Sequence, residues 1–129
     1  MTAGPVEIAI RGAMHTGDQL VTPTRSASFS LGRLDANGVV LLIGAKEAWT
    51  PMRWACLEGV VAFLHGQGWV EIGGKHASDA DPSTLDGYLR ACLRRSTGSY
   101  VAAHLERAGV LEIDRGRPAR VRLSAHPPG

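Results

Sequence analysis

The chain has 129 residues, the length of a single domain, and its 44% hydrophobic and 20% charged residues are typical of globular proteins rather than disordered ones. Two cysteines, Cys56 and Cys92, are too few for a disulfide scaffold or a four-thiolate zinc site. The N-terminus lacks a signal-peptide pattern, and the longest apolar run, residues 39–43, is too short to cross a membrane. We therefore expect a cytoplasmic protein with reduced thiols and no membrane partner.

The formal net charge of +2 is unevenly distributed. Residues 1–87 hold six bases and nine acids, a net charge of −3, whereas residues 88–129 hold eight arginines and three acids, a net charge of +5. Arginine outnumbers lysine 12 to 2, as in GC-rich coding, but this bias explains the residue type and not the clustering. The cationic C-terminal third indicates a polyanion or an acidic protein surface as partner.

The first 49 residues read as a small β unit. Alternating Val6, Ile8 and Ile10 predict a strand over residues 6–10, and residues 12–24 have the composition of a loop. Alternation at residues 27–31, an Asp-Ala-Asn-Gly turn and the apolar run at 39–43 predict a hairpin. We expect residues 1–49 to form an N-terminal β extension.

The pattern changes at Thr50-Pro51, a typical helix start, after which apolar residues follow at helical spacing from Met52 to Leu64. Residues 69–72 predict a short strand. A second helix opens at Ser83 with Asp86 as its capping-box partner, and a third runs over about 99–108 to Gly109. Alternation at 111–114 and 120–123 predicts a hairpin with a basic tip, followed by a frayed tail at 124–129.

This order of elements over residues 50–123 resembles the winged helix–turn–helix superfamily. The resemblance is carried by the capped helix from Ser83, the turn at 95–98, the helix ending at Gly109 and the hairpin at 110–123. It implies an α+β fold of three helices and a β-hairpin wing, preceded here by the β extension. It also implies a non-catalytic protein that binds double-stranded DNA, with the third helix in the major groove and the wing on the backbone or minor groove.

We accordingly predict a transcription regulator. Many members of the superfamily bind as two-fold dimers, so a homodimer is expected by analogy, with the β extension or Trp54 of the first helix as its contact. Trp49, Trp54 and Trp69 are otherwise interpreted as core and interface residues.

The predicted DNA-binding residues form three groups. The outward face of the third helix carries Ser99, Tyr100, Ala103 and Arg107, with Arg107 suited to bidentate pairing with guanine, although Glu106 on the same helix would repel phosphate. The wing tip carries Arg115 and Arg117 for phosphates or a minor groove. The second helix and the following turn carry Arg90, Arg94 and Arg95 for the backbone. For each group, an ordinary solvated surface remains the alternative.

Two further arginines are weaker candidates. If Ile113 faces Val121, then Glu112 opposes Arg122 and Asp114 opposes Arg120, so the hairpin can neutralise both.

Other functions are kept as alternatives. A winged helix can be a protein-interaction module, here docking an acidic partner, and an accessory subunit or enzyme with a pocket between the two parts is a third interpretation. The cysteines and histidines lack metal-ligand spacing, and Cys56 and Cys92 lie on predicted apolar faces as small core residues. Asp79, Asp81 and Asp86 near His76 are explained by a polar loop leading into a capped helix. We expect no cofactor, no metal and no catalytic group.

Overall fold

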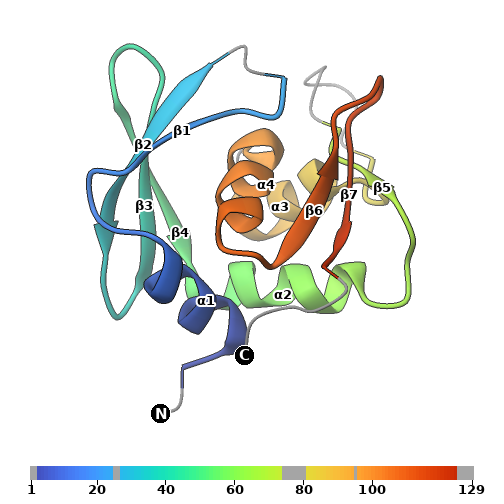
Figure 1. Ribbon diagram of the computed structural model, residues 1–129, viewed down its shortest axis with the longest axis horizontal. Helices are drawn as coiled ribbons and strands as arrows, with labels where there is room; N and C mark the ends of the chain where they lie inside the picture. The colour runs from blue at the N-terminus through green and yellow to red at the C-terminus, as the bar shows by residue number, and fades with distance from the viewer. Residues whose placement is uncertain (1–2, 25–26, 74–80, 95, 125–129) are drawn as a thin grey trace.

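A computed structural model describes residues 3–24, 27–73, 81–94 and 96–124. Within these ranges the chain is α+β, as predicted, with four helices and two antiparallel sheets rather than the three helices and one hairpin of the expected fold (Figure 1). The helices are α1 (Pro5–Ala13), α2 (Trp54–Leu64), α3 (Leu85–Leu93) and α4 (Gly98–Arg107). The strands are β1 (Gln19–Val21), β2 (Ser28–Leu34), β3 (Gly38–Ile43), β4 (Ala48–Arg53), β5 (Val70–Glu71), β6 (Leu111–Asp114) and β7 (Arg120–Leu123).

The strand predicted at residues 6–10 is wrong, because this segment is helix α1. Its buried residues are Val6, Ala9 and Ile10, which follow helical spacing, whereas Ile8 is 50% exposed. Pro5 occupies the first turn, where its missing N–H costs nothing, and the Glu58 carboxylate accepts hydrogen bonds from the Val6 and Glu7 N–H groups at 3.0 and 2.9 Å. The carboxylate of Glu58, distant in the sequence, therefore caps a helix in a segment whose apolar alternation predicts a strand.

The first sheet has the strand order β1-β2-β3-β4. The predicted hairpin is present as β2 and β3, and its turn is held by Asp35, whose Oδ1 accepts from the Asn37 and Gly38 N–H groups. Gly38 has a φ of +153°, and a Cβ there would collide with the Met52 carbonyl of the neighbouring strand. Strand β1 lies inside the segment predicted to be a loop, where its Leu20 is buried.

The predicted helix start at Thr50-Pro51 is also wrong. Both residues belong to β4, an edge strand, where a proline need not donate to a neighbour. Arg53 is the N-cap of α2, which begins at Trp54. The expected apolar face of this helix is confirmed at Cys56, Val60 and Leu64. Met52 is also buried, but it belongs to strand β4 and not to the helix. The boundary predicted between residues 49 and 50 therefore falls within a strand.

Helices α3 and α4 lie where the sequence predicts them, but their caps differ. Thr84 rather than Ser83 caps α3, because the Thr84 Oγ1 accepts from the Gly87 N–H at 3.0 Å. Asp86 does not complete a capping box with Ser83. Its Oδ1 accepts instead from the Gly98 N–H at 3.0 Å, at the first turn of α4.

The second sheet joins the short strand to the C-terminal hairpin in the order β5-β7-β6. The register is the one predicted: Ile113 pairs with Val121, Glu112 with Arg122, and Asp114 with Arg120. Of the tail predicted to fray, Ser124 donates its N–H to the Val110 carbonyl at 3.1 Å, and residues 125–129 lie outside the described residues.

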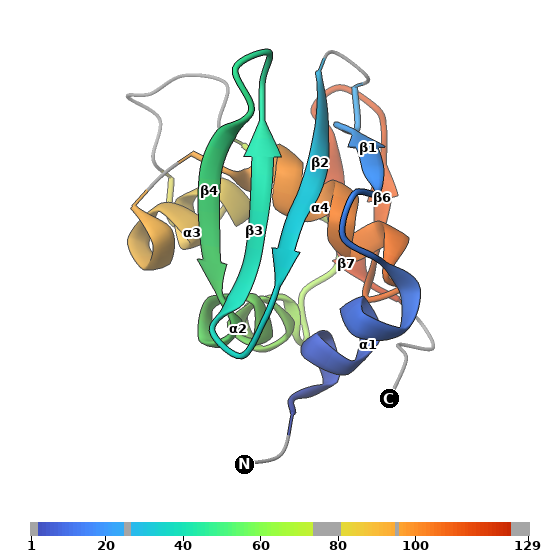
Figure 2. The ribbon, with the colours of Figure 1, turned by 90° about the vertical axis from the view of Figure 1, so that its left-hand side faces the viewer.

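Helix α4 lies at the centre of the molecule, between the first sheet and the β6–β7 hairpin (Figure 1). One hydrophobic cluster combines residues of both parts of the chain, such as Phe29 and Leu41 from the first sheet with Val101 and Leu105 from α4. Figure 2 shows the opposite face of strands β2, β3 and β4, on which no other element packs in the described part of the chain. Across those same residues, none of the helices has the length and apolar character needed to cross a bilayer.

Candidate nucleic-acid interface

The predicted reading face of α4 is turned toward the first sheet. Ala103 is 6% exposed, and the Tyr100 ring packs edge-on against Phe29 with ring centroids 5.2 Å apart. Arg107 is exposed, but its guanidinium donates to the Gln19 carbonyl of β1 at 3.4 Å. Ser99 is half-buried at the start of the helix. Strands β1 and β2 therefore contact the predicted DNA-reading face at Tyr100 and Arg107, although Arg107 itself is exposed.

Arg115, which follows β6 in the predicted wing, is held by Glu106 of α4. Its guanidinium donates two hydrogen bonds to the Glu106 carboxylate, at 2.8 and 2.6 Å, and this interaction raises the pKa of Arg115 above its usual value. Glu106, expected to repel phosphate, is thereby neutralised. Arg117 lies exposed in the loop between β6 and β7.

The other hairpin arginines are paired as predicted from the alternation. Arg122 lies 2.8 Å from Glu112, and Arg120 lies 3.3 Å from Asp114. The Arg122 guanidinium also covers the ring of Trp69 at 4.3 Å from its centroid. This face of the β6–β7 hairpin therefore carries compensated charge rather than a row of unpaired arginines.

The arginines of the second helix have separate environments. Arg90 lies 2.7 Å from the carboxylate of Asp86, which is 1% exposed, so its head group supports the α3–α4 junction. Arg94 is exposed at the end of α3 with a φ of +60°. Arg95 lies outside the described residues. Three C-terminal arginines without a carboxylate partner in the described ranges therefore remain, Arg94, Arg107 and Arg117, on three different elements.

A hollow of about 280 Å³ lies between the first sheet and the start of α4, where a pocket between the two parts was expected under the enzyme interpretation. Its lining includes Thr22, Ser99, Tyr100 and Asp86. The Asp86 oxygens are already engaged by Arg90, Ser96 and the Gly98 N–H. This carboxylate therefore supports the fold and is poorly placed for acid–base chemistry.

The histidines and acids do not gather into a metal-binding cluster of three or more in the described part of the chain. His104 is fully buried in α4. His76 and Asp79 lie outside the described residues. Asp81 accepts hydrogen bonds from the Ser83 N–H and hydroxyl, which lower the pKa of Asp81 and give it the role of a turn residue.

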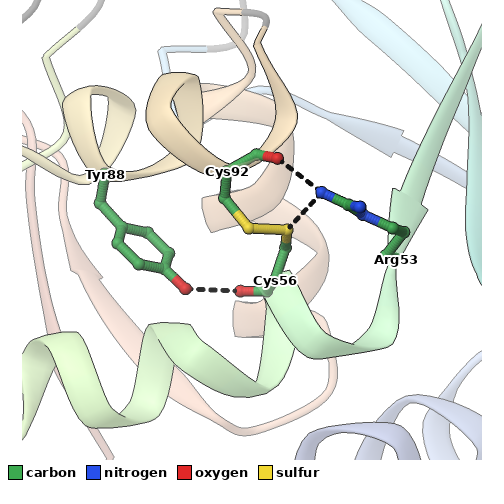
Figure 3. The surroundings of a disulfide bond; sticks show 4 residues. All are labelled: Arg53, Cys56, Tyr88 and Cys92. Carbon is green, nitrogen blue, oxygen red and sulfur yellow. Dashed lines mark hydrogen bonds between the residues drawn. A yellow bond between two sulfur atoms is a disulfide. The ribbon is translucent and has the colours of Figure 1, made fainter.

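The cysteines differ from the expectation of reduced thiols. Cys56 of α2 and Cys92 of α3 form a disulfide, with their Cα atoms 5.9 Å apart (Figure 3). The two lie 36 positions apart in the sequence, and only the packing of α2 against α3 brings them together. The sequence offered one signal, the placement of both cysteines on apolar helix faces.

The outward face of the first sheet was not predicted as a site. Its strand register aligns Arg33 with Val40 and Pro51 in one row, and Leu42 with Trp49 in the next. Trp49 is 53% exposed, and the Arg33 guanidinium lies 5.6 Å from its ring centroid. A shallow hollow of about 180 Å³ on this face is also lined by Arg53 and Asp35. Apolar and cationic side chains therefore share a face that no other described element covers.

Comparisons with protein-family models, with curated proteins and with solved structures found no match for this chain.

Proposed function

We propose that this protein is a non-catalytic protein-interaction module, in which residues 54–123 form a winged helix whose third helix is used for internal packing. The observation that carries the proposal is the burial of α4, with Ala103 6% exposed and Tyr100 packed on Phe29. A helix that reads DNA must bring several side chains to base edges. Here the first sheet occupies that position.

The order of elements supports the winged-helix assignment. A helix, a short strand, two helices joined by a tight turn and a hairpin follow one another from α2 to β7. The short strand β5 pairs with β7, so the strand and the hairpin form one sheet, as expected of a single structural unit. The bidentate contact between Arg115 and Glu106 ties this hairpin to α4.

The outward face of the first sheet is the best docking surface for a partner. Trp49 offers a large apolar contact, and the flanking Arg33 and Arg53 offer charge to carboxylates. Arg53 has no carboxylate partner in the described part of the chain, and Arg33 shares Asp35 at 3.5 Å. We therefore propose an acidic segment of another protein as the ligand of this face.

A photo-crosslinking residue in place of Trp49 tests this assignment in cells. We expect adducts with protein from position 49 but not from position 21, where Val21 is equally exposed on β1. Charge reversal by Arg33→Glu should reduce the adduct several-fold, because it repels an acidic partner, whereas Arg122→Glu on the wing should not. Adducts with nucleic acid, or adducts unaffected by Arg33→Glu, would contradict the proposal.

Duplex DNA binding by the wing is the second candidate function, favoured by the exposed Arg117 at the hairpin loop. A titration of random duplex with salt separates the two. If the wing clamps phosphates, affinity falls steeply with salt, and replacing both Arg115 and Arg117 with alanine lowers the log–log slope by roughly two. Under the proposed function no such slope is observed, and Arg107→Ala leaves base preference unchanged because no base is read.

The remaining predictions stay proposals. A cytoplasmic location, a homodimer and the lack of enzymatic activity are compatible with an interaction module. Trp54 does not provide the dimer contact as pictured from the sequence, because it is 9% exposed and its indole N–H donates to the Asp35 carbonyl at 2.9 Å. Sedimentation of the protein at tens of micromolar measures whether two copies pair.

A further inference from the structure

The Cys56–Cys92 disulfide lies in a chemically asymmetric environment (Figure 3). Cys92 is half-buried, whereas Cys56 is only 1% exposed. Cys92 is therefore the residue of the pair that a thiol from solution can approach more readily. In thiol–disulfide exchange, the sulfur that is not attacked leaves as a thiolate.

The leaving sulfur would be stabilised from two sides. Cys56 is the third residue of α2, where the helix N-terminus favours negative charge, and the first turn of α2 contains no acidic residue. The Arg53 guanidinium donates toward the Cys56 Sγ at 3.9 Å and to the Cys92 carbonyl at 2.9 Å. Cys92 sits near the C-terminus of α3, where the helix disfavours a thiolate. When the disulfide is cleaved, the negative charge is therefore more stable on the sulfur of Cys56 than on that of Cys92.

We infer that this pair is a reducible thiol–disulfide exchange site whose reductant is a small thiol such as glutathione or the dithiol of a reductase. The incoming thiolate attacks Cys92 Sγ, a new S–S bond forms there, and the Cys56–Cys92 bond breaks with its electron pair on Cys56 as a thiolate beside Arg53. A second thiolate attacks the sulfur that the first contributed, which leaves Cys92 as a thiolate to be protonated. Two thiols are oxidised to one disulfide, and the protein disulfide is reduced by two electrons.

Arg53 is a positioning residue in this scheme. It reaches from the end of β4 across to α3, so it couples the reduced thiolate to the sheet face that carries Trp49 and Arg33. The exchange chemistry does not depend on the proposed docking function, since it uses only the cysteines, Arg53 and the first turn of α2.

Peptide mapping of the oxidised protein during reduction tests the direction of attack. The air-oxidised protein is mixed with millimolar reduced glutathione, quenched with acid at successive times and digested. We expect the glutathione adduct on Cys92. An adduct mainly on Cys56, or two free thiols in the air-oxidised protein before reduction, would overturn the assignment.

The role of Arg53 is tested with Arg53→Met, with Arg33→Met as the matched control on the same sheet face. Removal of the guanidinium destabilises the thiolate product, so Arg53→Met should need a roughly tenfold higher ratio of the squared concentration of reduced glutathione to the concentration of oxidised glutathione for half-reduction. Arg33→Met should behave as the wild type. Equal ratios for all three proteins would exclude a role for Arg53.

Thiolate absorbance at 240 nm gives an independent readout on the intact reduced protein. We expect one thiolate to form below pH 7 in the wild type and in Arg53→Lys, which keeps the charge, and at a higher pH in Arg53→Met, closer to the ordinary cysteine range of about 8.5. If Arg53→Met loses its fold by circular dichroism, the pH at which the wild-type thiolate forms still tests the proposal. A wild-type thiolate that forms only near pH 8.5 would overturn the proposal.

Discussion

His104 shows how a single ionisable residue can be tied to the stability of the fold. Its ring is fully buried in α4, and Nδ1–H donates to the Tyr100 carbonyl one turn earlier at 3.1 Å. Nε2 has no hydrogen-bond partner among the described residues. Burial disfavours the charged imidazolium and lowers the pKa of His104 to about 4, from 6.5 in an open chain. The folded protein therefore holds a neutral histidine.

This burial predicts a pH dependence that His104→Leu removes. Because the folded pKa is lowered, the unfolded chain takes up the proton first, so stability is full above about pH 6.5 and falls until about pH 4. The loss between pH 7 and pH 5 is roughly 2 kcal/mol. Chemical denaturation at both pH values should show that difference in the wild type and not in His104→Leu. An unchanged pH slope in the variant would mean that other groups cause it.

At the scale of elements, Asp86 connects α3 to α4. Its side chain is 1% exposed and accepts from Arg90, from the Ser96 hydroxyl and from the Gly98 N–H. Gly98 is needed at this contact, because a Cβ there would approach the Asp86 Cβ to 2.9 Å. One carboxylate thus ties the first turn of α3 to the first turn of α4.

Asp86→Ala should lower the free energy of unfolding by about 3 kcal/mol, since it removes a helix cap and leaves the Arg90 guanidinium without its buried partner. Asp114→Ala is the matched control, because the Asp114 pair with Arg120 lies at the surface and is worth at most about 1 kcal/mol. Urea titrations measure both. Similar losses of unfolding free energy in the two variants would show that Asp86 stabilises the fold no more than an exposed carboxylate does.

At the scale of the whole molecule, the main feature is that α4 is buried between the two sheets. Val101, Ala102, Leu105 and His104 are all essentially inaccessible, and Ala103 is 6% exposed. A solvent-facing recognition helix would leave Ala103 open. The N-terminal sheet therefore belongs to the same packed unit as the helices and hairpin.

Ala103→Glu tests this packing. A carboxylate at a buried position without a partner should cost about 3 kcal/mol or more and lower the melting temperature strongly. Ala91→Glu on the exposed face of α3 provides the control and should change the melting temperature little. If both variants melt like the wild type, the face of α4 is open to solvent, and DNA reading by this helix regains support.

Local patterns predicted the elements whose stabilising contacts are local. The β2–β3 hairpin, β5, α3, α4 and the β6–β7 register all follow from apolar periodicity and turn residues. The errors occurred where a distant contact decides the outcome. The alternation of Val6, Ile8 and Ile10 predicts a strand, but Glu58, 51 or 52 positions away, favours the helix by capping it, and Ile8 is then left exposed. At Thr50-Pro51, pairing with β3 overrides a local helix-start signal.

By itself, the sequence determined the α+β class, the order of elements from α2 to β7 and the pairing of Arg120 and Arg122 with acids, since periodicity and register depend on neighbours in the chain. Only the tertiary structure decided which residues of α4 are exposed, that Cys56 and Cys92 form a disulfide, and that Arg115 forms an ion pair with Glu106. These outcomes depend on which surfaces pack together over long separations. Helical periodicity marks where a helix can be buried on one side, but it does not reveal that a second sheet will cover the other.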